Sequence, residues 1–157
     1  MTSMTICLWF DTEAEEAAQL YTSIFGGTVT DTQHYGEAGP GEPGSVMTVA
    51  FEAAGMPFVA LNGGPAHAHF TEAVSVQVHC ESQELVDEYW ARLTDGGEES
   101  RCGWLKDRFG LSWQIIPNRL MELLGDPDPE RSSRAMQAML GMRKIDIPAM
   151  EKAAAGG

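Results

Sequence analysis

The chain has 157 residues, which is the size of a single domain, and 43% of them are hydrophobic, enough to form a core without a partner. Its 23 acidic residues outnumber the 10 basic ones, and a net charge of −13 repels nucleic-acid phosphates and anionic lipid headgroups. We therefore expect no nucleic-acid or membrane partner, and, because no apolar run approaches the roughly 20 residues that span a bilayer, a soluble cytoplasmic protein.

The first half of the chain predicts one strand, one helix and three further strands. Residues 5–10 are rich in β-branched and aromatic side chains, and Thr12 followed by Glu15 has the spacing of a capping box at a helix start. The predicted helix has apolar residues at a 3–4 spacing and ends at Gly26 and Gly27. Three strand-like runs, divided by Gly- and Pro-rich turns, follow at residues 28–35, 45–52 and 56–61.

The same order of elements begins again about 70 residues later, which indicates an internal duplication. Residues 74–79 alternate with period two, and Ser82 is a candidate N-cap for a helix that ends at Gly96 and Gly97. Further strand-like runs lie at residues 98–102, 104–108 and 111–117. The sequence therefore predicts two βαβββ modules in the α+β class.

This tandem repeat resembles the vicinal-oxygen-chelate superfamily, which includes glyoxalases, dioxygenases and bleomycin-resistance proteins. A closer likeness is carried by Tyr21 and by residues 8–11, 25–27, 61–65, 70–73 and 102–110. In these stretches the chain is similar to the PhnB-like subfamily, whose members are often named 3-demethylubiquinone-9 3-methyltransferase.

The resemblance implies that modules at about 4–65 and 73–117 form a curled mixed sheet, a glyoxalase-like cup, in a domain of residues 1–117. Residues 118–157 are expected to form a helical tail that packs on this domain or on a partner subunit. The tail is predicted to carry an apolar stripe at Met136, Met139 and Leu140. The habit of related modules to pair across a two-fold axis implies a homodimer.

Strand alternation predicts which side chains face the cup. On the strand at residues 74–79, the valines at 74, 76 and 78 are suited to packing under a helix, which leaves Ser75, Gln77 and His79 facing inward. By the same rule Leu8 and Phe10 face the helices and Trp9 faces the cup. On the last strand, Trp113 and Ile115 face the helices, whereas Ser112, Gln114 and Ile116 face inward. Residues 107–110 are interpreted as a hairpin turn.

Metal-dependent members of the superfamily hold a divalent ion with His, Glu or Gln on the first, fourth, fifth and eighth strands. In this sequence those positions fall near Thr5 or Cys7, at Ala60 or Asn62, at Ala73 or Ser75, and at Gln114. Among them Gln114 has the only suitable side chain, and one neutral amide does not hold a catalytic metal. We therefore predict no metal and no other cofactor.

The predicted cavity is lined by aromatic rings and by side chains that form hydrogen bonds. Its ligand-binding residues are predicted to be Trp9, Asn62, Phe70, Ser75, Gln77, Trp104 and Gln114. This composition predicts a PhnB-like protein that binds a small, mostly uncharged or aromatic ligand in a metal-free cup, whether as a binding protein or as a cofactorless enzyme. No catalytic residue is assigned.

Two alternatives remain open. One is a divalent-metal-dependent lyase or dioxygenase whose ligands are unexpected ones such as His67, His69 or His79 together with Gln114. The other is a methyltransferase, as the family name suggests, although the chain lacks the Gly-rich strand-to-helix turn of a doubly wound nucleotide fold.

Overall fold

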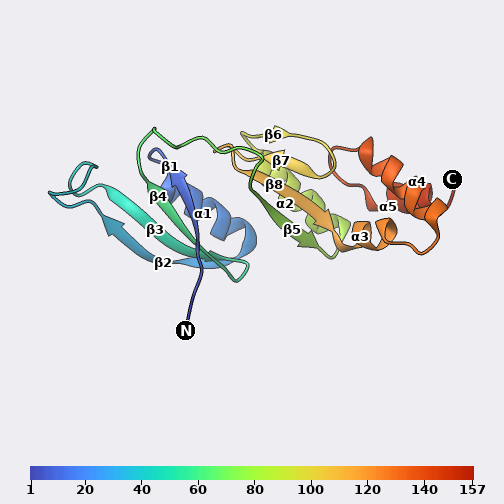
Figure 1. Cartoon of the computed structure of the whole chain (residues 1–157), viewed down its shortest axis with the longest axis horizontal. Helices are drawn as coiled ribbons and strands as arrows, with labels where there is room; N and C mark the ends of the chain where they lie inside the picture. The colour runs from blue at the N-terminus through green and yellow to red at the C-terminus, as the bar shows by residue number, and fades with distance from the viewer. The chain divides into compact units, whose positions relative to one another are not determined.

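The computed structural model describes all 157 residues and divides into two compact units, Met1–His69 and Phe70–Gly157. Each unit contains one four-stranded mixed sheet and one helix from a βαβββ order of elements, and the second unit carries three more helices (Figure 1). The predicted α+β class and tandem βαβββ architecture are confirmed. The curling of the two sheets into one cup remains a prediction.

The first unit consists of one helix and four strands: β1 (Ile6–Phe10), α1 (Ala14–Phe25), β2 (Gly27–His34), β3 (Val46–Ala53) and β4 (Met56–Asn62). The strand order is β1-β4-β3-β2, with β1 parallel to β4 and the other neighbours antiparallel. Leu8 and Phe10 of β1 are buried, whereas Cys7 is exposed and Trp9 is half-buried. The alternation predicted for this strand is therefore confirmed.

The start of α1 differs from the predicted capping box. The helix begins at Ala14, and its N-cap residue, Glu13, makes no side-chain cap. Thr12 does not cap the helix; its backbone N–H donates to a carboxylate oxygen of Glu13 at 2.8 Å. The amide oxygen of Asn62 instead accepts a hydrogen bond from the backbone N–H of Ala14 at 2.8 Å, so the cap comes from the end of a distant strand.

The second unit repeats the order of the first with β5 (Ser75–Cys80), α2 (Gln83–Thr94), β6 (Glu98–Glu99), β7 (Trp104–Lys106) and β8 (Ser112–Pro117). The strand order is β5-β8-β7-β6, with β5 parallel to β8. The hydroxyl of Ser82 accepts a hydrogen bond from Leu85 N at 3.3 Å, which confirms the predicted cap of α2.

β6 and β7 are shorter than the sequence predicts. Cys102 and Gly103, which lie between them, have φ angles of 56° and 83°, so the chain turns where the sequence pattern reads as nearly continuous strand. Glu99 is the last residue of β6, and its carboxylate accepts a hydrogen bond from the indole N–H of the buried Trp90 at 2.7 Å. This bond fixes α2 to the short strand.

Asp107 closes the hairpin between β7 and β8. Its buried carboxylate accepts hydrogen bonds from Phe109 N at 2.9 Å, Leu111 N at 3.1 Å and the indole N–H of Trp113 at 2.9 Å. These bonds confirm the interpretation of residues 107–110 as a turn. They also show that Trp113 is a core residue with a polar anchor.

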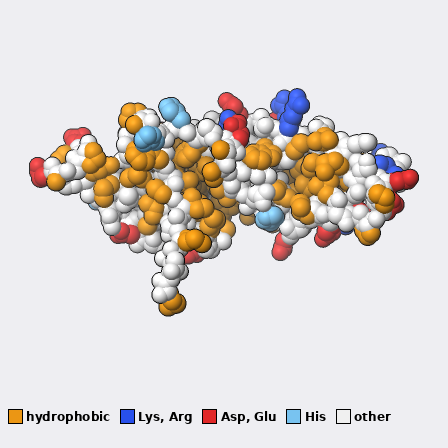
Figure 2. All heavy atoms as spheres, viewed as in Figure 1, with side chains coloured by type: hydrophobic (Ala, Val, Ile, Leu, Met, Phe, Trp, Pro, Cys, Tyr) orange, Lys and Arg blue, Asp and Glu red, His pale blue; other side chains and the backbone are white.

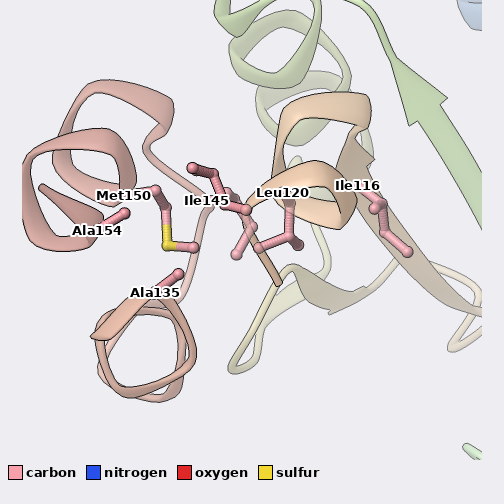
Figure 3. Close-up of a cluster of buried hydrophobic side chains, with 7 residues drawn as sticks. Ile116, Leu120, Ala135, Ile145, Met150 and Ala154 are labelled. Carbon is pink, nitrogen blue, oxygen red and sulfur yellow. The ribbon is translucent and has the colours of Figure 1, made fainter. Parts of the chain in front are cut away.

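The tail forms α3 (Asn118–Leu124), α4 (Pro129–Leu140) and α5 (Ile147–Ala154). These helices share a core with the end of β8 (Figure 3). That core consists of Ile116, Leu120, Leu123, Ala135, Ile145, Met150 and Ala154. Backbone bonds add a second attachment, since Cys102 N and Gly103 N donate to the carbonyls of Met142 and Arg143 at 2.9 and 2.8 Å.

Within the chain, one of the three residues of the predicted stripe on α4 packs against the tail core. Met139 packs against the tail core, but Met136 and Leu140 are 41% and 58% exposed. The buried side of α4 contains Ala135 and is continued by the partly buried Ala138 and Met139. The alanines allow close helix packing, and the sequence interpretation overlooked them in favour of larger side chains. None of the helices is both long and apolar enough to cross a membrane.

Candidate functional site

The sheet of the second unit has one face covered by α2 and one face that α2 leaves uncovered. Val76 and Val78 pair with Trp113 and Ile115, and the last two are 3% and 0% exposed. These residues lie on the covered face, as predicted. Val74 does not follow the prediction, because it precedes β5 and is 64% exposed. Alternation then places the neighbouring positions of β5, β7 and β8 on the uncovered face.

A row of three side chains crosses the uncovered face. Gln77 of β5 pairs in register with Gln114 of β8, which pairs with Trp104 of β7. Because paired residues in a sheet point to the same side, these three predicted ligand-binding residues are brought together. Figure 2 shows hydrophobic side chains gathered over this part of the second unit.

The amides of this row are joined in a directed chain of hydrogen bonds. Gln77 Nε2 donates to Gln114 Oε1 at 3.3 Å, and Gln114 Nε2 donates to the hydroxyl of Ser75 at 2.8 Å. The chain leaves an amide oxygen at the Gln77 end and a hydroxyl hydrogen at the Ser75 end. It therefore offers an acceptor and a donor to a ligand lying beside Trp104, which is half-buried.

Two residues of this face are not among the predicted ligand-binding residues, although Ser112 is predicted to face inward. Lys106 lies two residues beyond Trp104 on β7, and its ammonium contacts Glu72 Oε1 at 2.7 Å. Ser112 pairs in register with both Lys106 and Ser75, and it is completely buried with no hydrogen-bond partner for its hydroxyl. Strand alternation, which places Ser112 inward, could have indicated the inward position of Lys106 as well.

The Lys106–Glu72 pair perturbs both groups. The hydrogen bond from Lys106 lowers the pKa of the Glu72 carboxyl, and the hydrogen bond to Glu72 raises the pKa of the Lys106 ammonium. Both groups are thus charged at neutral pH, and the pair contributes no net charge to the face.

In the first unit, Trp9 lies on the sheet face opposite to α1. Its indole N–H donates to the carbonyl of Gly64 at 2.9 Å, and its ring meets the ring of His67 edge-on at a centroid distance of 5.0 Å. Trp9 pairs in register with Leu61. A Cβ at Gly63 would overlap the indole ring, so glycine is required at that position.

Asn62 does not share a face with Trp9. It pairs in register with Phe10, whose side chain is buried on the side of α1, and its amide is engaged by the backbone. Beyond the bond to Ala14, Asn62 Nδ2 donates to Val46 O at 3.2 Å. The structure therefore gives this predicted ligand-binding residue a structural role at the end of β4.

A hollow of about 410 Å³ lies beside Asn62 at the start of α1. Three of its lining residues, Asp11, Glu15 and Glu42, are acidic, and the buried ring of Tyr35 forms part of the wall. The Tyr35 hydroxyl donates to the backbone carbonyl of Asn62 at 2.6 Å. No sequence pattern indicated this hollow, because its lining residues come from α1, β3, β4 and the loops beside them, which are distant in the sequence.

The remaining site candidates lie outside these faces or are exposed. Phe70 is half-buried in the segment between β4 and β5. His67 and His69 lie in the same segment and are exposed, as is His79 on β5.

The side chains present do not match a metal site of the superfamily. No group of three or more His, Cys, Asp or Glu residues is placed to hold a metal ion. Gln114, the one suitable residue among the expected positions, has its amide oxygen engaged by Gln77. A neutral amide in a chain of neutral partners is a poor replacement for carboxylate and imidazole ligands.

Two βαβββ units, each with a sheet face left open beside aromatic and polar side chains, define a protein of the glyoxalase-like, vicinal-oxygen-chelate class. The chain belongs to the 3-demethylubiquinone-9 3-methyltransferase family, whose model matches residues 2–116. No curated protein matches it.

Solved structures agree with this assignment. A PhnB protein from Bacillus cereus is 32% identical, with 74% of this chain and 99% of that chain covered and a TM-score of 0.67. Protein PA1353 from Pseudomonas aeruginosa is 19% identical over 74% and 98% of the two chains, with a TM-score of 0.62. The fosfomycin resistance protein FosX from Listeria monocytogenes, in complex with Mn(II) and sulfate, is 17% identical over 79% and 95%, with a TM-score of 0.53. The last two likenesses show the fold.

Proposed function

We propose that this PhnB-like protein binds a small, mostly uncharged or aromatic ligand on the uncovered face of β5, β7 and β8, without a metal or other cofactor. The main observation in support of this proposal is the hydrogen-bonded chain of Ser75, Gln114 and Gln77, which lies beside the half-buried ring of Trp104. Phe70 remains proposed as a further aromatic contact in the second unit, and Trp9 remains proposed as a ligand-binding residue on the open sheet face of the first unit.

The chemistry of the row favours a planar ligand that is itself a donor and an acceptor. Trp104 supplies a ring for stacking and an indole N–H, and the amide chain supplies polar groups in fixed positions. Because these groups are already oriented by one another, little side-chain entropy is lost when a ligand binds. The row supplies no assigned nucleophile or general base, so binding is the function proposed here.

The proposal is tested with 2-naphthamide, an uncharged aromatic amide, by isothermal titration calorimetry. Trp104→Phe retains a ring, whereas Trp104→Ala removes the stacking surface and should weaken binding by about two- to tenfold. Gln114→Ala breaks the hydrogen-bonded chain that orients the Gln77 amide and the Ser75 hydroxyl toward the ligand, and should weaken binding by up to about tenfold.

The control is Gln137→Ala, which changes an exposed amide on α4 and should leave binding unchanged. Unchanged affinity in folded Gln114→Ala and Trp104→Ala proteins would move the binding site away from this face. Absence of naphthamide binding by the unmodified protein would also count against the proposal.

The metal-dependent alternative keeps support from the fold shared with FosX, whose structure contains Mn(II). It is tested by elemental analysis of protein purified without an affinity tag. Stoichiometric Mn, Fe, Ni or Zn that is lost on substitution of His67, His69 or His79 would favour a lyase or dioxygenase over the metal-free proposal.

Methyl transfer is kept as a third candidate because the matching family model is described by that activity. Its test is calorimetric titration with S-adenosylmethionine. We further propose that the protein is a homodimer, which light scattering on a sizing column would measure directly.

A further inference from the structure

The uncovered face of the second unit carries one cation beside its aromatic ring. Among the strand positions on that face, Lys106 is the only Lys or Arg, and it lies two residues from Trp104 along β7. Two residues of strand correspond to about 7 Å, which is close to the length of a small aromatic carboxylate. A ring over Trp104 would therefore bring a carboxylate within reach of the Lys106 ammonium.

That ammonium is already in contact with a carboxylate of the chain itself. Glu72, which precedes β5, contacts Lys106 Nζ at 2.7 Å through Oε1, and its side chain is 61% exposed. Exposed ion pairs of this kind contribute little free energy, because water screens the charges and both side chains lose freedom. Glu72 is thus easily replaced by another carboxylate.

A second observation on the same sheet face is a buried hydroxyl that has no hydrogen-bond acceptor. Ser112 lies between Ser75 and Lys106 in the sheet register, and its buried hydroxyl has no partner. Such a group is costly to leave unsatisfied, so buried hydroxyls normally find a partner. Because Ser112 pairs in register with Lys106, an oxygen-rich group held at Lys106 is on the same sheet face as this donor.

We propose that Glu72 occupies an anion subsite at Lys106, and that the ligand of this face is an aromatic carboxylate whose carboxylate displaces Glu72 while its ring stacks on Trp104. This inference rests on the proposed function, because it names the ligand class of the same face. The strongly acidic chain can accept a single carboxylate here, since the ligand is paired with Lys106 and the displaced Glu72 carboxylate, whose side chain is 61% exposed, is solvated by water.

The test compares two probes of the same shape, 2-naphthoate and 2-naphthamide, by calorimetry. Glu72→Gln removes the competing carboxylate and should strengthen naphthoate binding by about two- to fivefold while leaving naphthamide binding unchanged. Lys106→Gln should weaken naphthoate binding by at least the same factor, again without effect on naphthamide. Both positions are partly exposed, so both variants should fold.

The matched control is Glu88→Gln, which removes the carboxylate of another exposed pair, Glu88 with Arg92 on α2. It changes the net charge of the protein by the same amount as Glu72→Gln does. An equal gain in naphthoate affinity in both variants would show that the gain comes from the lower overall negative charge, and would contradict an anion subsite at Lys106. Ser112→Ala should weaken naphthoate binding more than naphthamide binding.

The outcomes separate the two proposals. If naphthamide binds and depends on Trp104, but Glu72→Gln leaves naphthoate affinity unchanged or lower, the anion subsite is wrong and the binding face stands. If neither probe binds the unmodified protein, both proposals are overturned.

Discussion

Asn62, the last residue of β4, accepts a hydrogen bond from the backbone N–H of Ala14, the first residue of α1, at 2.8 Å. The two residues are separated by 48 positions in the chain. One side-chain amide therefore performs the task that a local Ser, Thr or Asp performs at most helix starts. It couples the helix to the sheet that the helix covers.

Replacing this amide should destabilise the first unit. Asn62→Ala removes the cap of α1 and the bond to Val46 O, so we expect a loss of about 1–3 kcal/mol in the free energy of unfolding. Urea unfolding followed by circular dichroism measures the change. The matched control, Asn118→Ala, changes an exposed amide and should stay within about 0.5 kcal/mol. Equal stability of the two variants would contradict a structural role for Asn62.

The cap at Asn62 is a feature that the sequence could not predict, whereas the faces of the strands could be predicted. Alternation of side chains is a local property, and it correctly separated Gln77 and Gln114 from Val76 and Trp113. The cap depends on a contact between distant residues, so local pattern favoured the capping box at Thr12. Such contacts become visible only when the register of β1 and β4 is known.

The same reasoning explains the outcome at the candidate site. The amide and aromatic residues of β5, β7 and β8 could be grouped because they follow one strand period. Lys106 and Ser112 follow that period too, but a lysine beside Glu72 and a serine with no partner are recognised only from distances and burial. The hollow at α1 had no sequence signal, because its lining residues are brought together from distant parts of the chain and share no period.

The turn at Asp107 should be sensitive to loss of its charge. Asp107→Asn places an amide hydrogen against donors of Phe109, Leu111 and Trp113, and we expect a loss of about 2–4 kcal/mol because charge-assisted bonds to a buried carboxylate are disrupted. Thermal and urea unfolding would measure the loss. Asp95→Asn makes the same chemical change at an exposed position and should be nearly neutral. A loss below about 1 kcal/mol in Asp107→Asn would contradict the anchoring role.

Cys80 should make the protein less stable in alkaline solution. Burial raises the pKa of its thiol from 9.0 to about 11. The unfolded chain therefore loses the thiol proton at a lower pH than the folded chain does. The contribution of the protonated thiol to the free energy of unfolding is fully present below about pH 9 and is lost as the pH rises toward about 11. Unfolding free energies of the unmodified protein and Cys80→Ala, compared at pH 8 and pH 10.5, isolate this contribution. A constant difference between the two proteins across that range would contradict it.

Gly63 should not tolerate a side chain. The Cβ of Gly63→Ala would overlap the ring of Trp9, and moving the ring breaks its bond to Gly64 O, so a loss of about 1–3 kcal/mol is expected. A change in tryptophan emission should accompany the loss. Gly36→Ala is the control, because its added Cβ would meet no atom within 4 Å. Unaltered emission and stability in Gly63→Ala would show that the ring has room to shift.

The position of Trp9 also allows the unfolding of the two units to be followed separately by tryptophan fluorescence. Trp9 is the only tryptophan of the first unit, whereas Trp90, Trp104 and Trp113 all belong to the second. In a Trp9→Phe protein, emission follows only the second unit, and the difference from the unmodified protein follows the first. Coincident unfolding curves would identify one cooperative transition, and separate curves would give each half of the duplication its own measurable stability.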